Sequence, residues 1–139
     1  MNFKEVPNVQ PLRFLSEPIY SICRVVVGFM FALHGAQKLF AVLGHEEAVE
    51  LFSLLGFAGV IEFFGGSLII LGLYTPWVAF LASGEMAFAY FTAHYSQNIW
   101  PILNGGETAL LYCFIFLFFA SRGSGSLSLD RMIWGQKRA

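Results

Sequence analysis

Residues 51–73 read LFSLLGFAGVIEFFGGSLIILGL, an apolar run interrupted near its middle by one charged residue, Glu62. A membrane-spanning helix needs about 20 consecutive, mostly apolar residues, so this run is long enough for one span. The pattern breaks at Thr75-Pro76, because proline lacks a backbone donor and disfavours helix in the residue before it. The stretch therefore predicts a helix within a bilayer, followed by a tight turn.

Three further apolar stretches accompany this run, at residues 19–40, 77–95 and 105–122. The last is the shortest, because its apolar part covers only about 21 Å of a hydrocarbon layer about 30 Å thick. Tilt, local thinning of the bilayer or the charges at its ends must make up the difference. The connections are short, which makes consecutive helices antiparallel neighbours.

The sequence thus predicts an all-α integral membrane protein, an antiparallel bundle of four transmembrane helices. The predicted spans are 19–40, 51–73, 77–95 and 105–122, within a membrane domain at 19–122. An N-terminal segment (1–18) precedes this domain and a C-terminal tail (123–139) follows it.

The composition agrees with a membrane protein and excludes several classes of function. Hydrophobic residues make up 57% of the 139 residues and charged residues 12%, against about 25% charged in an average soluble domain. The net charge of −1 offers no basic surface for nucleic acid. Cys23 and Cys113 lie far apart and no CxxC motif is present, so neither a thiol redox pair nor a cysteine metal site is encoded.

The positions of Lys and Arg predict the orientation, because basic residues in short loops favour the cytoplasmic side. The loops at 41–50 and 96–106 contain none. Six basic residues lie at the two ends of the membrane domain, two in the N-terminal segment, one at the last residue of the domain and three in the tail: Lys4, Arg13, Arg122, Arg131, Lys137 and Arg138. We therefore expect both termini in the cytoplasm and a multi-pass protein of the cytoplasmic (plasma) membrane.

Charged groups at membrane depth are costly and are candidate functional residues by default. His34, Lys38, Glu62 and Glu85 fall on inward faces of their predicted helices and form a candidate quinone and proton site. Arg24 is a candidate ion-pair partner of the two acids, although its long side chain could instead reach the cytoplasmic surface. A purely structural network, which only fixes the register of the helices, explains the same residues equally well.

Asn104 and Glu107 precede the fourth apolar run at the spacing of a helix-capping box. Local capping accounts for both residues, and an acid in the first turn is also favoured by the helix dipole. The alternative is that they belong to the site.

Several of these residues occur in motifs that resemble those of the DoxX family of small membrane proteins. The resemblance extends from about Arg24 to Asp130. Its elements are Arg24 with Gly28, His34-Gly35 and Lys38, Glu62 with Gly65-Gly66 and Gly72, Asn104-Gly105-Gly106-Glu107, and Gly123, Gly125, Ser128 and Asp130. The turn at Thr75-Pro76-Trp77 lacks the basic residue that many members have there. The resemblance implies a four-helix membrane protein of a prokaryote, in a family named for a subunit of a thiosulfate to quinone oxidoreductase.

Two functions remain open at this stage. The first is a membrane subunit of a quinone-dependent oxidoreductase, which binds a quinone and receives electrons from a partner subunit, since no flavin or metal motif is visible. The alternative is a non-catalytic accessory subunit that stabilises a larger complex. The lipid bilayer is a partner in both cases, together with other membrane or redox subunits or further copies of the chain. A carrier of small solutes or protons is a third, weaker hypothesis.

Overall fold

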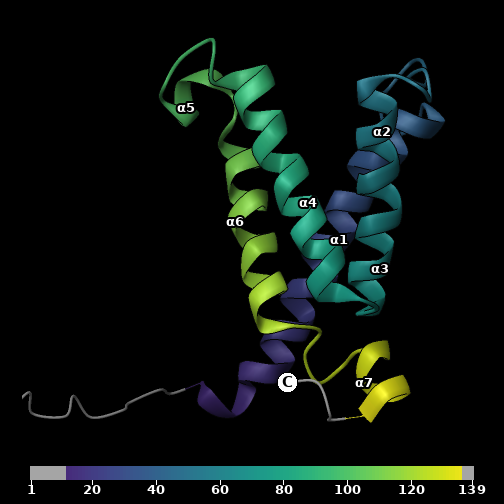
Figure 1. Cartoon of the computed structure of the whole chain (residues 1–139), viewed down its shortest axis with the longest axis vertical. Helices are drawn as coiled ribbons and strands as arrows, with labels where there is room; N and C mark the ends of the chain where they lie inside the picture. The colour runs from purple at the N-terminus through teal and green to yellow at the C-terminus, as the bar shows by residue number, and fades with distance from the viewer. Residues whose placement is uncertain (1–11, 136–139) are drawn as a thin grey trace, which may run out of the picture.

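The structure of the chain is a computed structural model that describes residues 12–135, and its regular elements are all helices (Figure 1). Four long helical segments dominate this part of the chain. They are α1 (Ser16–Phe40), the continuous α2 (Leu54–Val60), η2 (Ile61–Gly65) and α3 (Gly66–Leu71), the continuous α4 (Thr75–Ala89) and η3 (Tyr90–His94), and α6 (Glu107–Arg122). Three short helices are η1 (Arg13–Leu15), α5 (Pro101–Asn104) and α7 (Leu129–Trp134).

The helix ends follow from local chemistry and differ slightly from the predicted spans. Helix α2 begins at Leu54 rather than 51, because the Ser53 Oγ accepts a hydrogen bond from the Gly56 N–H (3.0 Å) and caps the helix. Helix α4 begins at Thr75 rather than 77, because proline is tolerated in the first turn of a helix, where Pro76 lies. The fourth long helix begins at Glu107 rather than 105.

The long helices form two pairs (Figure 1). Helix α1 packs along α2, η2 and α3, and α4 packs along α6. The pairs meet near the lower end of Figure 1, where α4 contacts α3 and η2, and they diverge toward the end that carries α5. A buried cluster joins them through Phe31 of α1, Ile69 of α3 and Phe116 of α6.

Small residues let the first pair approach closely. A Cβ atom added to Gly35 of α1 would lie 2.3 Å from the Phe63 backbone nitrogen and 2.6 Å from the Gly59 carbonyl oxygen. Such contacts are shorter than any that real side chains tolerate, so this crossing requires glycine. Close backbone approach at small residues is typical of helix pairs in membranes.

The tail segment 123–135 folds back under the lower end of the bundle. Gly125 has a φ of +75°, and a Cβ there would lie 2.7 Å from the Tyr20 ring, so both the backbone conformation and the contact favour glycine. Ser128 caps α7 by accepting a hydrogen bond from the Arg131 N–H (3.3 Å). The Gly123, Gly125, Ser128 and Asp130 motif therefore shapes the tail against α1 and α4.

Two helical stretches, Arg13–Phe40 and Leu54–Leu71, are long and apolar enough to cross a membrane. Large apolar side chains are exposed along the outer faces of all four long helical segments, among them Phe29, Phe64, Phe91 and Phe114. Such surfaces are expected where lipid rather than water surrounds a protein.

Candidate functional site

One cavity of about 680 Å³ lies between the two helix pairs, and we call it the inter-pair cavity. Its lining comes from α1, α2, η2, α4, η3 and α6, and it includes all four residues of the predicted quinone and proton site, His34, Lys38, Glu62 and Glu85. Most of the remaining lining is apolar. The structure thus brings together on one surface the four residues that the helical pattern places on inward faces.

Lys38 and Glu62 form an ion pair on this surface. The Lys38 Nζ lies 2.5 Å from Glu62 Oε1 and 2.6 Å from Oε2, and the Glu62 residue is only 2% exposed. The pair joins α1 to η2, so it fixes the register of these two helices. An ammonium group has three donors, and two of them point at Glu62. The third remains available to a molecule in the cavity.

Glu85 and Tyr112 place unpartnered polar atoms in the same cavity. The Glu85 Oε2 and the Tyr112 hydroxyl are both buried, and neither has a hydrogen-bond partner within residues 12–135. The Tyr112 residue is 7% exposed. Buried polar groups are nearly always paired, because an unpaired group loses its bonds to water without compensation. These two atoms are therefore available to hydrogen-bond a bound molecule.

His34 stands at a more open part of the lining. Its ring meets the Tyr112 ring edge to face, with centroids 6.1 Å apart. The His34 residue is exposed and lines the cavity. A molecule in the cavity can therefore reach its two ring nitrogens.

His94 also lines the cavity, which the helical pattern does not predict. In an ideal α-helix, positions 85 and 94 lie about 180° apart. The structure departs from this helix in η3, where the Tyr95 N–H donates to the Tyr90 carbonyl (2.9 Å), five residues back. A π-turn takes in one extra residue, which turns the residues at its end back toward the Glu85 side. The His94 Nδ1 lies 2.9 Å from the Asn104 carbonyl oxygen.

Arg24, a candidate ion-pair partner of Glu62 and Glu85, bonds neither acid. The Arg24 residue is 1% exposed, and its guanidinium donates to the backbone carbonyls of Ile69, Ile70 (2.9 Å) and Leu127 (2.5 Å). The first two are carbonyls at the end of α3, which carry the negative end of the helix dipole, and the Ile69 carbonyl also accepts from the Gly72 N–H (3.1 Å). Arg24 therefore satisfies a helix end and ties the tail to it, at the lower end of the bundle.

Asn104 and Glu107 do not form the expected capping box. In a capping box the Asn side chain accepts from the backbone N–H three residues on, whereas Asn104 Oδ1 accepts from Gly106 N–H (2.7 Å), two residues on. The reason is that Asn104 ends α5 and Gly105 takes a left-handed conformation before α6 begins. The Asn104 Nδ2 donates to the Asn98 carbonyl (2.7 Å), so this buried amide organises the loop. Glu107 is exposed and does not line the cavity.

Two lining residues, His94 and Tyr112, are absent from the site predicted by sequence. Tyr112 carries a signal that could have found it, because its hydroxyl is a polar group within the apolar run 108–121. The position of His94 depends on the π-turn, for which we find no sequence signal.

Comparison with known proteins agrees with the motifs. The family model described as DoxX matches residues 19–95, which include Arg24, His34, Lys38, Glu62 and Glu85. A protein of Haemophilus influenzae, which bears the name "Uncharacterized protein", is 46% identical over 114 residues, covering 77% of this chain and 84% of that protein. No solved structure matches the chain. With more than half of its length matched by the family model, the chain belongs to the DoxX family of membrane proteins.

Proposed function

We propose that this DoxX-family protein spans the cytoplasmic membrane of a prokaryote four times, and that its inter-pair cavity binds the headgroup of a quinone. In this orientation both termini lie in the cytoplasm. The distribution of charge supports this topology. The lower end of the bundle in Figure 1 carries η1, the end of α6 and α7, which contain Arg13, Arg122 and Arg131, whereas the loops at 41–50 and 96–106 have no basic residue.

The surroundings of the cavity support an amphiphilic ligand that arrives from the bilayer. Part of the lining consists of exposed apolar side chains on α2 and α4, including Leu54, Phe57, Phe80 and Phe88. A molecule that enters past these side chains moves through an apolar environment before it meets the charged groups. A quinone has the required form, with a polar headgroup and an apolar tail.

The observation that carries the proposal is the pair of unpartnered atoms, Glu85 Oε2 and Tyr112 Oη, in the lining of one cavity. The two carbonyl oxygens of a quinone accept hydrogen bonds. The Tyr112 hydroxyl, the third donor of Lys38 and the His34 ring can supply them. Glu85 adds a carboxyl group that can release or accept a proton.

The chemistry then divides between this chain and a partner. Reduction of a quinone to a quinol takes up two electrons and two protons, and oxidation of the quinol reverses both. We assign the proton exchange to Glu85, because Glu62 is held by Lys38 through both of its oxygens. The electrons come from, or go to, a partner redox subunit.

Quinone binding in lipid nanodiscs tests the proposal. A short-tailed benzoquinone and a short-tailed naphthoquinone are each titrated into the protein by isothermal calorimetry. We expect Tyr112→Phe, which removes only one hydroxyl, to weaken binding about tenfold, the equivalent of about 1.4 kcal/mol for one lost hydrogen bond. Glu85→Gln keeps the hydrogen-bonding shape and should preserve binding while it slows quinone turnover in membranes that contain the partner.

Ser67→Ala serves as the matched control, because the Ser67 hydroxyl donates to the Phe63 carbonyl (2.7 Å) and does not line the cavity. If neither quinone binds the wild-type protein, or if Tyr112→Phe and Ser67→Ala bind equally, the proposal is wrong. In that case the accessory-subunit hypothesis becomes the better one, and the amount of the partner complex in cells that lack this protein is the next measurement.

A further inference from the structure

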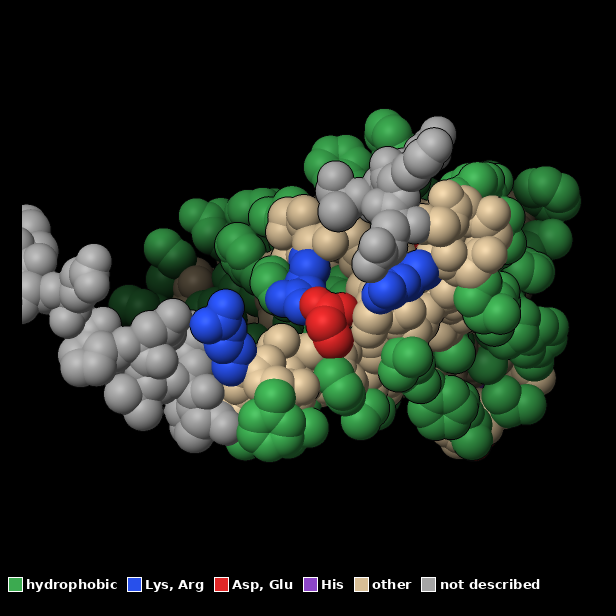
Figure 2. Space-filling model, turned by 90° about the horizontal axis from the view of Figure 1, so that it is seen from below, with side chains coloured by type: hydrophobic (Ala, Val, Ile, Leu, Met, Phe, Trp, Pro, Cys, Tyr) green, Lys and Arg blue, Asp and Glu red, His purple; other side chains and the backbone are tan. Residues whose placement is uncertain are grey.

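A second pocket, of about 450 Å³, lies at the lower end of the molecule, away from the inter-pair cavity. Its walls are the start of α1, the start of α4 and the tail segment, and we call it the tail pocket. The lining that matters here comprises Glu17, Tyr74, Trp77, Arg122, Arg131 and Trp134. Figure 2 views the molecule from this end and shows charged side chains gathered near its middle, with hydrophobic side chains around them.

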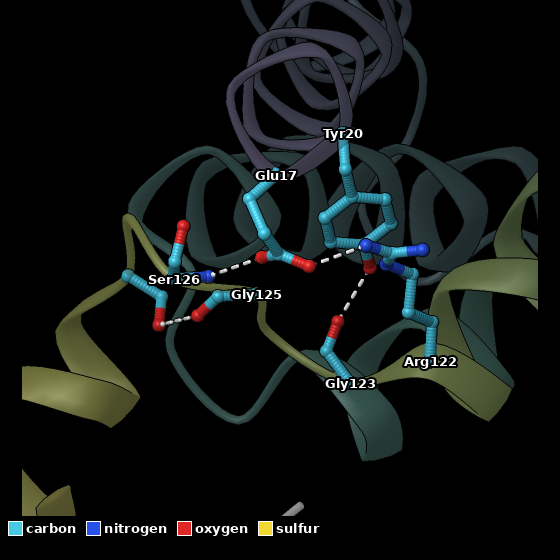
Figure 3. A network of polar contacts seen from close by, with 7 residues as sticks. Glu17, Tyr20, Arg122, Gly123, Gly125 and Ser126 are labelled. Atoms are coloured by element: carbon cyan, nitrogen blue, oxygen red, sulfur yellow. Dashed lines mark hydrogen bonds and ion pairs between the residues drawn. The ribbon is translucent and has the colours of Figure 1, made fainter. Parts of the chain in front are cut away.

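A network of hydrogen bonds gives the pocket its shape (Figure 3). The Tyr20 hydroxyl donates to the Gly123 carbonyl (2.5 Å), which holds the tail against α1 where it leaves α6. Glu17 accepts from the Arg122 guanidinium (2.5 Å) and from the Ser126 N–H (3.1 Å). The Arg122 guanidinium also lies over the Tyr20 ring, 4.3 Å from its centroid. The pocket is thus a built structure and not a gap left by a loose tail.

The two acids of the pocket are already satisfied by donors of the protein. Both oxygens of Glu17 accept the bonds just described. Asp130 accepts from the Tyr74 N–H (2.9 Å), the Thr75 N–H (3.4 Å) and the Ser124 hydroxyl. These carboxylates therefore have little capacity left to attract a cation.

The two arginines, in contrast, keep donors to spare. Arg122 uses one nitrogen for Glu17, whereas a guanidinium carries five N–H donors. The Arg131 guanidinium has no hydrogen bond or ion pair with any residue from 12 to 135. The hydrogen-bonding groups of the pocket that remain free are thus positively charged N–H donors. Such donors bind an anion. Guanidinium groups suit phosphate in particular, because they can bond two of its oxygens at once.

Aromatic walls point to a lipid as the source of the phosphate. Trp77 is 77% exposed, and the Tyr74 and Trp134 rings stand 5.2 Å apart at the edge of the pocket. Exposed Met132 and Ile133 extend the apolar surface along α7. Trp and Tyr are enriched at the level of lipid headgroups, where an apolar ring meets a polar surface. Dissolved phosphate would need none of these side chains.

We propose that the tail pocket binds the phosphate of an anionic phospholipid, with Arg122 and Arg131 as donors and with Trp77 and Trp134 beside the glycerol region. This goes beyond the proposed quinone function and does not depend on it. Because the same bonds that shape the pocket hold the tail to α1 and α4, a bound lipid would also stabilise the folded tail.

Retention of lipid by the full-length protein tests this inference. The protein is extracted in mild detergent, supplied with equal amounts of a phosphatidylglycerol and a phosphatidylcholine, and examined by native mass spectrometry. The main variant is Arg131→Gln, because the Arg131 side chain makes no hydrogen bond or ion pair with a residue that the structure describes. We expect it to reduce retention of phosphatidylglycerol about fivefold, the effect of one basic residue at an anionic membrane surface. Arg131→Lys should give a smaller loss.

Arg13→Gln is the matched control, since Arg13 lies at the same end, has the same charge and does not line the pocket. Equal losses in Arg131→Gln and Arg13→Gln would overturn the inference, because they would show general attraction to a charged surface. So would displacement of the lipid by millimolar inorganic phosphate, which would identify a phosphate site instead. Quinone binding by these variants is expected to be unchanged, so the two proposals can fail separately.

Discussion

The Arg24 Nη2 donates to the carbonyl of Leu127, 103 residues later, across 2.5 Å. The Arg24 Nη1 donates to two carbonyls at the end of α3, so one buried side chain holds together α1, α3 and the tail. This arrangement gives a structural reason for the basic residue near the start of the first helix. It also separates Arg24 from the chemistry of the inter-pair cavity.

Replacement of this arginine should destabilise the whole molecule. Arg24→Gln keeps a polar side chain but cannot reach all three carbonyls, and hydrogen bonds from charged groups are worth about 1.5–3 kcal/mol each. We expect a loss of about 3 kcal/mol in the free energy of unfolding, measured by SDS titration followed by circular dichroism. Arg13→Gln, which changes the same charge at an exposed position, should cost less than about 0.5 kcal/mol. Equal losses would contradict the assigned role.

The Lys38–Glu62 ion pair makes a second prediction about stability. Lys38→Met leaves Glu62 buried without a partner, and breaking a buried pair on one side costs about 3–5 kcal/mol. The double variant Lys38→Met, Glu62→Gln removes both charges and should be more stable than Lys38→Met alone. The double-mutant cycle is measured by the same SDS titration. Additive losses would show that the two side chains do not interact.

The crossing of α1 with η2 makes a third prediction. Gly35→Ala introduces a Cβ at 2.3 Å from the Phe63 nitrogen, so the two helices must move apart. We expect a loss of more than about 2 kcal/mol and a lower melting temperature. Gly84→Ala is the control, because no atom lies within 4 Å of a Cβ there. Its stability should be equal or slightly higher, because alanine favours helix over glycine.

Glu17 predicts how the attachment of the tail depends on pH. Burial by itself raises the pKa of Glu17, but hydrogen bonds from Ser126 and Arg122 and the charge of Arg122 outweigh it, so the net pKa is lowered. A lowered pKa in the folded state means that the contribution to stability is complete above the pKa of the unfolded chain, about 4.3, and is lost as the pH falls below it. Glu17→Gln lacks this titration, so tryptophan fluorescence should show a tail that is held less firmly already at neutral pH and that depends less on pH in the acid range than in the wild type. Identical acid transitions in both proteins would contradict this role.

The positions of the long helices were predictable because they depend on local sequence. Apolar runs of about 20 residues, broken at Thr75-Pro76 and at 96–106, predict four helices, and their observed ends lie within three residues of the predicted limits. The inward faces of α1, α2 with η2, and α4 follow from a regular period of 3.6 residues. This period is why His34, Lys38, Glu62 and Glu85 could be grouped before any coordinates were known.

The sequence pattern does not predict features that depend on a departure from the regular helical period, or on a contact with a residue far away in the sequence. The π-turn in η3 shifts His94 into the cavity, and only the packing of the chain reveals it. From the sequence alone, Arg24 could turn toward the acids or toward the membrane surface that we predict to be cytoplasmic, since both lie within reach of a long side chain. The structure shows neither direction, because the end of α3 and the folded tail bring three backbone carbonyls to the guanidinium.

The sequence by itself determined the class of the protein, its helices and the residues that face inward, because hydrophobic periodicity and charge act over a few neighbouring residues. The tertiary structure alone decided which polar groups satisfy one another. Lys38 forms an ion pair with Glu62, and Arg24 donates hydrogen bonds to three backbone carbonyls. Glu85 and Tyr112 each keep a buried polar atom that has no hydrogen-bond partner among the described residues. The physical reason is that hydrogen bonds form only within about 3 Å, and that distance between remote residues exists only once the helices are packed.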